Sequence, residues 1–334
     1  MLSKLLFILF IMNTVVQANW GEYKSLFVAH DGRVIDRVNS DITHSESIGY
    51  ALYLSLKNDD IKTFDKIYKW YKDNLTTNDF GLISWKWGKD KNESWHILDK
   101  NNASDGDLWI AYDNLLMYEK TNQIHYKQEA LSLIKNIKQH LIMNHKGRLY
   151  LLPAKTGFNT ESYFEINLSY YLFFIFDKFV QYDNDTTWKR LKNDGINLLN
   201  EAKFSPLKLH SDWIRIDKRT LKIELTRNNS FGYDALRIPF NILKSDIKDK
   251  DKLLEPYIQY VNSMKSVDSV FGTSDLKNGT ISLFNYSFAH LSIYNMLDKH
   301  FNNMSSFTNE IKSLKGKNKN DYYSYSIYLF TTFN

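Results

Sequence analysis

The chain carries, at residues 101–109, the stretch Asn-Asn-Ala-Ser-Asp-Gly-Asp-Leu-Trp. It sets two carboxylates, Asp105 and Asp107, at the start of an expected helix and beside a tryptophan. Two other stretches, residues 43–50 and 232–237, repeat this combination of an acid with aromatic neighbours. Carboxylates donate protons and activate water while aromatic rings stack on sugars, so the combination favours hydrolysis of a glycosidic bond.

Each stretch taken alone also has a purely structural explanation. Glu46 lies among Ser and Thr before an apolar segment, as an acid in the first turn of a capped helix does. Asp105 and Asp107 resemble half of a calcium loop, but no Glu follows at the spacing of an EF-hand. Asp234 and Arg237 fit a surface salt bridge on one helix face. The function therefore depends on the three stretches acting together.

Composition excludes several classes of protein. The chain has 334 residues with 43% hydrophobic and 24% charged residues, which is ordinary for a globular protein. The net charge of +5 gives no indication of nucleic-acid binding. Cysteine is absent, which excludes a Cys nucleophile and Cys-based metal sites. No His-Glu-x-x-His pattern occurs either, and we expect neither a metal nor a cofactor.

The first 18 residues have the pattern of a secretory signal. Lys4 precedes the apolar run at residues 5–12, and small residues end the segment at Ala18. The run is too short for a typical bilayer span, although an uncleaved anchor remains the alternative. We expect a periplasmic or secreted protein of residues 19–334, with no stable membrane insertion.

The hydrophobic periodicity is helical along most of the chain. We read one domain from 19 to 334, because no linker divides it. Two architectures fit: a helical solenoid, and an all-α (α/α)6 barrel of helical hairpins with a few short β elements. The lack of a fixed-period repeat favours the barrel. Helices are expected near 45–57, 61–75, 107–119, 133–141, 165–180, 186–200, 233–243, 253–264, 283–298, 304–315 and 321–332. Long loops are expected at 77–104, 144–165 and 205–232. Short β elements are expected at 147–152 and 213–225.

The motifs together resemble one known family, glycoside hydrolase family 8. They are Arg-Val-Ile-Asp at 33–36, His-Ser-Glu-x-x-Gly-Tyr at 44–50, Ala-Ser-Asp-Gly-Asp-x-Trp-x-Ala at 103–111 and Tyr-Asp-Ala-x-Arg at 233–237. The branch that it resembles is the periplasmic endoglucanase that accompanies bacterial cellulose synthase. Residues 85–89, 151–158 and 204–213 are similar to that branch too.

The resemblance implies an (α/α)6 barrel, an open cleft and an inverting mechanism. It implies that Glu46 is the general acid, that Asp234 is the general base and that Asp105 grips the sugar at the cleavage point. For Glu46 to remain protonated, we expect partial burial and the nearby charge of Asp105. The expected substrate-binding residues are Tyr50, Trp85, Trp87, Asp107, Trp109, Tyr170, Tyr233 and Arg237.

The sequence departs from the family pattern at two places near the site. Ser47 and Ile48 occupy positions where the family usually has Gly after the acid, so crowding of the backbone is expected there. The usual Asn-Pro-Ser-Tyr reads Asn-Leu-Ser-Tyr at residues 167–170. The departures bear on substrate details.

The resulting expectation is an endo-β-1,4-glucanase that cleaves cellulose-type glucan and assists bacterial cellulose synthesis or export. Its partners would be the glucan and the export complex of cellulose synthase, and we expect a monomer. Chitosan, xylan and mixed-linkage glucan remain alternative substrates. A non-catalytic glycan-binding protein and a lyase or epimerase on the same fold are the alternatives from other classes.

Overall fold

The computed structural model describes residues 19–76, 79–267, 269–283, 285–302 and 307–333. The predicted signal at 1–18 lies outside the described residues. The helices are α2 (Ser45–Lys57), α3 (Ile61–Leu75), α4 (Ser104–Thr121), α5 (Ile124–Leu141), α6 (Phe173–Val180), α7 (Thr187–Glu201), α8 (Ile238–Leu243), α9 (Lys250–Val267), α10 (Phe288–His300), α11 (Thr308–Lys317) and α12 (Tyr322–Thr332), with 3-10 turns η1 (Leu168–Tyr170) and η2 (Ala235–Arg237).

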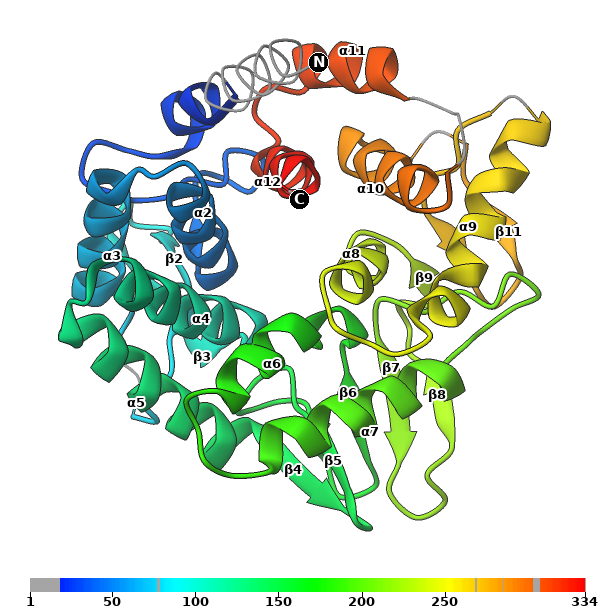
Figure 1. The fold of residues 1–334 in the computed structure, drawn as a ribbon, viewed down its shortest axis with the longest axis horizontal. Helices are drawn as coiled ribbons and strands as arrows, with labels where there is room; N and C mark the ends of the chain where they lie inside the picture. Colours follow the sequence, from blue (N-terminus) through cyan, green and yellow to red (C-terminus); the bar gives the residue numbers. More distant parts are fainter. Residues whose placement is uncertain (1–18, 77–78, 268, 284, 303–306, 334) are drawn as a thin grey trace, which may run out of the picture.

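The helices form two concentric rings (Figure 1). Even-numbered helices α2 to α12 surround the centre, and α3, α5, α7, α9 and α11 lie outside them. Each inner helix contacts the next, and α12 contacts α2, so the inner ring is closed. The (α/α)6 barrel is confirmed and the solenoid is excluded, because a solenoid does not return to its first helix.

Burial distinguishes the two rings. The inner helix α2 is buried on all sides, with Ile48, Ala51, Leu52 and Leu54 fully inaccessible. The outer helix α3 instead buries one stripe and leaves charged residues facing solvent. An apolar stripe at helical spacing is what a surface helix needs to pack on a core. The sequence thus encodes the ring to which each of these two helices belongs.

Short antiparallel sheets lie in the connections. The expected β elements are confirmed by β5 (Arg148–Leu151), β7 (Ile214–Asp217) and β8 (Ile223–Leu225). The loop expected at 77–104 instead contains a hairpin whose first strand pairs with the residues before α2. The helix expected over 165–180 is wrong in its first half. The remaining strands are β1 (Thr43–His44), β2 (Ser84–Lys89), β3 (Trp95–Asn102), β4 (Ile142–His145), β6 (Tyr163–Ile166), β9 (Ser230–Phe231), β10 (Ser274–Asp275) and β11 (Thr280–Ile281).

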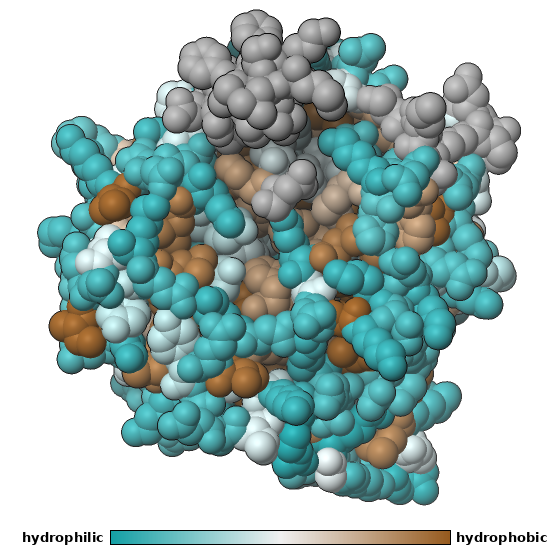
Figure 2. Space-filling view, viewed as in Figure 1, coloured by the Kyte–Doolittle hydropathy of each residue, from teal (hydrophilic) through white to brown (hydrophobic). Residues whose placement is uncertain are grey.

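The outer surface is mainly hydrophilic, with apolar residues showing in the hollow at the centre of the ring (Figure 2). Across the described ranges, every helix falls short of the length and apolar character that crossing a membrane demands.

Candidate active site

One large cleft opens beside the inner ring, with a volume of about 930 Å³. Glu46 and Asp234 both line it, although 188 positions separate them in sequence (234 − 46). Their side chains are 17% and 31% exposed, so both carboxylates are reached from the cleft. The cleft is large enough for several sugar units, since drug-sized ligands occupy pockets of about 300–1,000 Å³.

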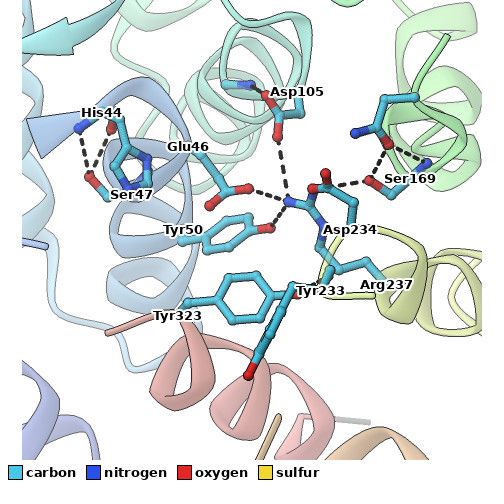
Figure 3. Close-up of polar contacts among 12 residues, drawn as sticks. His44, Glu46, Ser47, Tyr50, Asp105, Ser169, Tyr233, Asp234, Arg237 and Tyr323 are labelled. Carbon is cyan, nitrogen blue, oxygen red and sulfur yellow. Dashed lines mark hydrogen bonds and ion pairs between the residues drawn. The ribbon is translucent and has the colours of Figure 1, made fainter. Parts of the chain in front are cut away.

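A single guanidinium, that of Arg237, joins three carboxylates (Figure 3). Its Nη1 donates to Oε2 of Glu46 and lies 3.5 Å from Oδ2 of Asp105. Its Nη2 lies 2.5 Å from Oδ1 of Asp234. Glu46 and Asp234 therefore lie on different ends of one planar group, close to each other but separated by it. Arg237 is 4% exposed, and hydrogen bonds to the hydroxyls of Tyr50 (2.8 Å) and Ser169 (2.9 Å) fix its position.

Two glycines explain why Glu46 and Asp105 meet. A Cβ on Gly49 would lie 2.5 Å from the Cβ of Trp109, and a Cβ on Gly106 would lie 2.2 Å from the Oγ of Ser45. The helices α2 and α4 therefore cross at a distance that only glycine permits. Since each acid stands in the first turn of its helix, the close crossing brings the two carboxyls together.

The acid is also held by a reciprocal helix cap. Nδ1 of His44 accepts from the backbone N–H of Ser47 at 3.2 Å, and the Ser47 hydroxyl donates to the His44 carbonyl at 2.7 Å. The structure shows Ser47 inside this cap rather than crowding the backbone. The departure from the family pattern at this position thus has a local structural function.

Asp234, the predicted general base, stands in a loop that one buried carboxylate holds. Oδ1 of Asp212 accepts from the backbone N–H groups of Gly232 (3.0 Å) and Ala235 (2.8 Å), which flank Tyr233 and Asp234. A Cβ on Gly232 would lie 2.3 Å from Oδ2 of Asp212, so glycine is needed for this approach. Asp212 thereby fixes the backbone on both sides of the base.

The charge distribution differs from the expectation for a protonated acid. Burial raises the pKa of Glu46, but the charges of Arg237 and His44 and the hydrogen bond from Tyr322 outweigh it, so that this pKa lies below its ordinary value. Burial, followed by the charge of Glu46, raises the pKa of Asp105 well above its ordinary value. In the ligand-free protein the surroundings of Glu46 therefore favour its ionised form, and those of Asp105 favour its protonated form. That Glu46 carries the proton when substrate is bound stays a prediction.

Asp234 lies in a mixed environment. Burial raises its pKa, and the opposing charge of Arg237 and the side chains of Asn167 and Trp213 offset this only in part. A carboxyl with a raised pKa is a stronger base once ionised. Asp234 is thus suited to take a proton from water.

The cluster offers little room for a metal ion. Arg237 occupies the space among the three carboxylates and already neutralises part of their charge. Among the residues that the structure describes, no group of three or more His, Asp and Glu side chains is arranged to hold a metal ion.

Three predicted substrate-binding residues are buried in the protein. Trp109 is 2% exposed and stacks on Phe330 in the core, so the prediction that it stacks on sugar is wrong. Asp107 is fully buried and accepts hydrogen bonds from the N–H of Ile83 (2.8 Å) and the amide of Asn102 (2.7 Å). It therefore anchors the connection to β2 and β3 instead of binding substrate. Tyr50 is 2% exposed and reaches only inward, to Arg237.

Arg237, also predicted to bind substrate, is buried but contacts the carboxylates at the cleft. The remaining four predicted substrate-binding residues keep some access. Tyr233 is 39% exposed and lines the cleft, and Tyr170 is half-buried with Arg237 over its ring at 5.7 Å. Trp85 and Trp87 are half-buried on β2. Trp87 stacks on Trp95, with ring centroids 4.8 Å apart. Sugar binding by these four predicted residues stays a prediction.

Sequence analysis missed four residues that contact the cluster or hold its loop. Tyr322 donates to Glu46, Tyr323 donates to the carbonyl of Tyr233, Ser169 contacts Arg237, and Asp212 holds the loop of the base. The Asp-Trp pair at 212–213 was noticed only as part of a motif. For the tyrosines, the helical pattern at 321–332 gave no signal that distinguishes a site residue from a core residue.

The chain matches the model of glycosyl hydrolases family 8 over residues 2–333. It is 30% identical to an endoglucanase of Cellulomonas uda over 249 residues, which are 74% of this chain and 68% of that protein. It is 32% identical to an endoglucanase of Escherichia coli K12 over 226 residues, 66% of this chain and 60% of that protein. The solved endoglucanase of Komagataeibacter sucrofermentans superposes with a TM-score of 0.84 at 26% identity, covering 95% of this chain and 96% of that one. By its motifs, its barrel and this match, the chain belongs to glycosyl hydrolases family 8.

Proposed function

We propose that this protein is an endo-β-1,4-glucanase that cleaves cellulose-type chains with inversion, using Glu46 as general acid and Asp234 as general base. The observation that carries the proposal is the placement of both carboxyls in one cleft, separated by a guanidinium. An inverting enzyme needs about 6.5–9.5 Å between its carboxyls so that a water molecule fits on the far side of the sugar. Carboxyls in direct contact would not leave that space.

In the proposed reaction, the acid and the base act on opposite faces of one sugar. Glu46 gives its proton to the glycosidic oxygen as the bond from that oxygen to C1 breaks. A water oxygen bonds to C1 from the other face, and its proton passes to Asp234. Asp105, held beside Glu46, takes the role of gripping the sugar at the cleavage point.

Glu46 must carry a proton when substrate is bound. In the ligand-free protein, Arg237 donates to Glu46 and favours its ionised form. A sugar hydroxyl that displaces this contact would remove the stabilising charge and so raise the pKa of Glu46. Substrate binding is thus proposed to activate the acid.

The substrate class follows from the relatives, which are named endoglucanase, and from a solved relative of Acetobacter xylinum described as an endo-beta-1,4-glucanase. The test is a panel of carboxymethylcellulose, chitosan, xylan and mixed-linkage glucan, with release of reducing ends as readout. We expect the fastest release from carboxymethylcellulose. Faster release from another polymer would replace the substrate, and binding without any release would replace the enzyme by a glycan-binding protein.

We further propose that residues 1–18 are removed on export and that the single domain from residue 19 acts outside the cytoplasm, beside the cellulose export machinery. The apolar run after Lys4 and the family resemblance support this. N-terminal sequencing of the protein from its native host tests the first part, with Asn19 as the expected first residue. Loss of normal cellulose output on deletion of the chain tests the second.

A further inference from the structure

The last helix of the chain delivers a hydroxyl to the acid. Tyr322 is the first residue of α12, whose start is capped by Asp321 accepting from the N–H of Ser324 at 2.9 Å. The Tyr322 hydroxyl donates to Oε1 of Glu46 at 2.6 Å across 276 positions of sequence. The side chain is 3% exposed, and its ring packs edge-on against His44 with centroids 5.1 Å apart. The cap and the packing leave this hydroxyl little freedom.

The two oxygens of Glu46 have different partners. Oε1 faces Tyr322, and Oε2 faces Arg237. A protonated carboxyl has one oxygen that carries the hydrogen and one that only accepts. A phenol that donates to Oε1 makes it the accepting oxygen, which leaves Oε2 to carry the proton. In the ligand-free protein Oε2 accepts from Arg237, so Oε2 carries the proton only after substrate has displaced that contact.

We propose that Tyr322 is a positioning residue for the general acid, holding Oε1 of Glu46 so that Oε2 is the oxygen that passes its proton to the leaving sugar. The inference rests on the proposed function and adds a residue to it. Tyr322 itself touches no reacting atom. Its effect would be on the orientation of the acid and on the pH at which the acid loses its proton.

The pH effect has a definite sign. A hydrogen bond from Tyr322 favours the ionised form of Glu46, so removing it raises the pKa of Glu46. Activity at high pH is lost when the acid loses its proton, and the high-pH limb of kcat therefore moves to higher pH in a variant without the hydroxyl. The titratable and charged groups that surround Glu46 come from several elements. They are His44, Tyr50, Asp105, Tyr322 and Arg237, with Tyr23, Tyr170, Tyr323 and Asp234 further out.

The test compares Tyr322→Phe with Tyr325→Phe. Both rings belong to α12 and pack near Phe27, with centroids 6.4 and 5.5 Å away, but only Tyr322 donates to Glu46. For Y322F on carboxymethylcellulose we expect kcat to fall on the order of tenfold, while KM stays within about twofold of the wild type. The midpoint of the high-pH limb of kcat should move to higher pH by about one pH unit. Y325F should match the wild type in both respects.

A second readout uses an aryl cello-oligosaccharide with a dinitrophenol leaving group. This leaving group departs without much help from an acid, so the defect of Y322F should largely disappear. An unshifted limb, a defect confined to KM, or an equal defect on both substrates would overturn the role of Tyr322. A wild-type chain that releases no reducing ends would instead overturn the proposed function, so the two failures are distinguishable.

Discussion

Glu46 stands in the first turn of α2, a helix buried on all sides in the inner ring, whereas Asp234 stands in the loop that leads into η2. Side chains hold the acid: Tyr322 and Arg237 donate to its two oxygens. Arg237 also donates to Asp234, but the backbone around Asp234 is held by Asp212, which accepts from the N–H groups on both sides. Glu46 is thus tuned by the side chains that donate to it, whereas Asp234 is placed mainly by its loop.

The largest expected effects come from the two carboxyls themselves. Glu46→Gln and Asp234→Asn should each lower kcat on carboxymethylcellulose by a factor on the order of 10³, because each removes one proton transfer. Glucan binding and the thermal unfolding curve should stay close to those of the wild type.

Activity of the same two variants on the dinitrophenyl substrate distinguishes the proposed general acid from the proposed general base. E46Q should recover much of its activity there, since a good leaving group needs little protonation, while D234N should not, since water must still be activated. Recovery by D234N instead of E46Q would mean that the two roles are exchanged.

A smaller effect on kcat is expected from Asp212, which holds the backbone on both sides of Asp234. Asp212→Ala removes the acceptor for Gly232 and Ala235 and should lower kcat by roughly a hundredfold, since a shift of about 1 Å at the reacting group costs that much. Asp212→Asn keeps an acceptor oxygen and should retain kcat within about threefold. Steady-state kinetics of both variants give the comparison, and equal loss in the two would show that the charge of Asp212, and not its grip on the backbone, matters.

Asp105 and Asp107 offer a similar test within one motif. Asp107→Ala leaves the buried N–H of Ile83 without its acceptor and should lower the unfolding free energy by about 1–3 kcal/mol. The kcat of the folded D107A enzyme should change little, whereas Asp105→Asn should lower kcat without loss of stability. Denaturant unfolding and kinetics on the same samples check both halves, and an inactive but fully stable D107A would contradict the assignment.

The smallest effect concerns the stability of the protein at low pH, through a histidine close to Asp212. His210, two positions before Asp212, is fully buried, and burial lowers its pKa from 6.5 to about 4. The unfolded chain binds this proton near pH 6.5 and the folded chain only near pH 4. Through His210 alone, the unfolding free energy should therefore fall by roughly 3 kcal/mol as the pH drops through that window. The raised pKa values of Asp107 and Asp212, both about 7, act in the opposite direction over the same range.

Chemical denaturation across pH 4–7 measures this fall. His210→Gln cannot titrate, so the wild-type unfolding free energy minus that of H210Q should fall by roughly 3 kcal/mol from pH 6.5 to pH 4. A difference that stays constant across this range would contradict the assignment of a buried neutral His210.

The sequence was sufficient to predict the barrel and the four residues Glu46, Asp105, Asp234 and Arg237, which the structure brings together. Their catalytic roles stay predictions. Each of these acids stands at a helix start or just ahead of a helical turn, where Ser, Gly and aromatic neighbours mark it. The hairpin of β2 and β3 was missed because its residues are mostly polar and lack regular alternation. Trp109 was misassigned, because the local sequence does not show whether a tryptophan beside a site motif faces the cleft or the core.

Residues that depend on ring closure were beyond the sequence. Tyr322 reaches Glu46 only because α12 packs against α2, a contact between the two ends of the described chain. The protonation of Glu46 likewise depends on Arg237 lying between three acids, which the expected salt bridge to Asp234 alone did not reveal. Local patterns thus predict which residues form the cluster, while tertiary contacts determine how their side chains are arranged.

The anomeric form of the first product tests the central claim most directly. Proton NMR of cello-oligosaccharide cleavage, followed within the first minutes, should show the α-anomer at the new reducing end before mutarotation mixes the forms. That result is required if water attacks from the side of Asp234 while Glu46 protonates the opposite face. An initial β-anomer would contradict the account, because it would demand a covalent intermediate on one of the carboxylates.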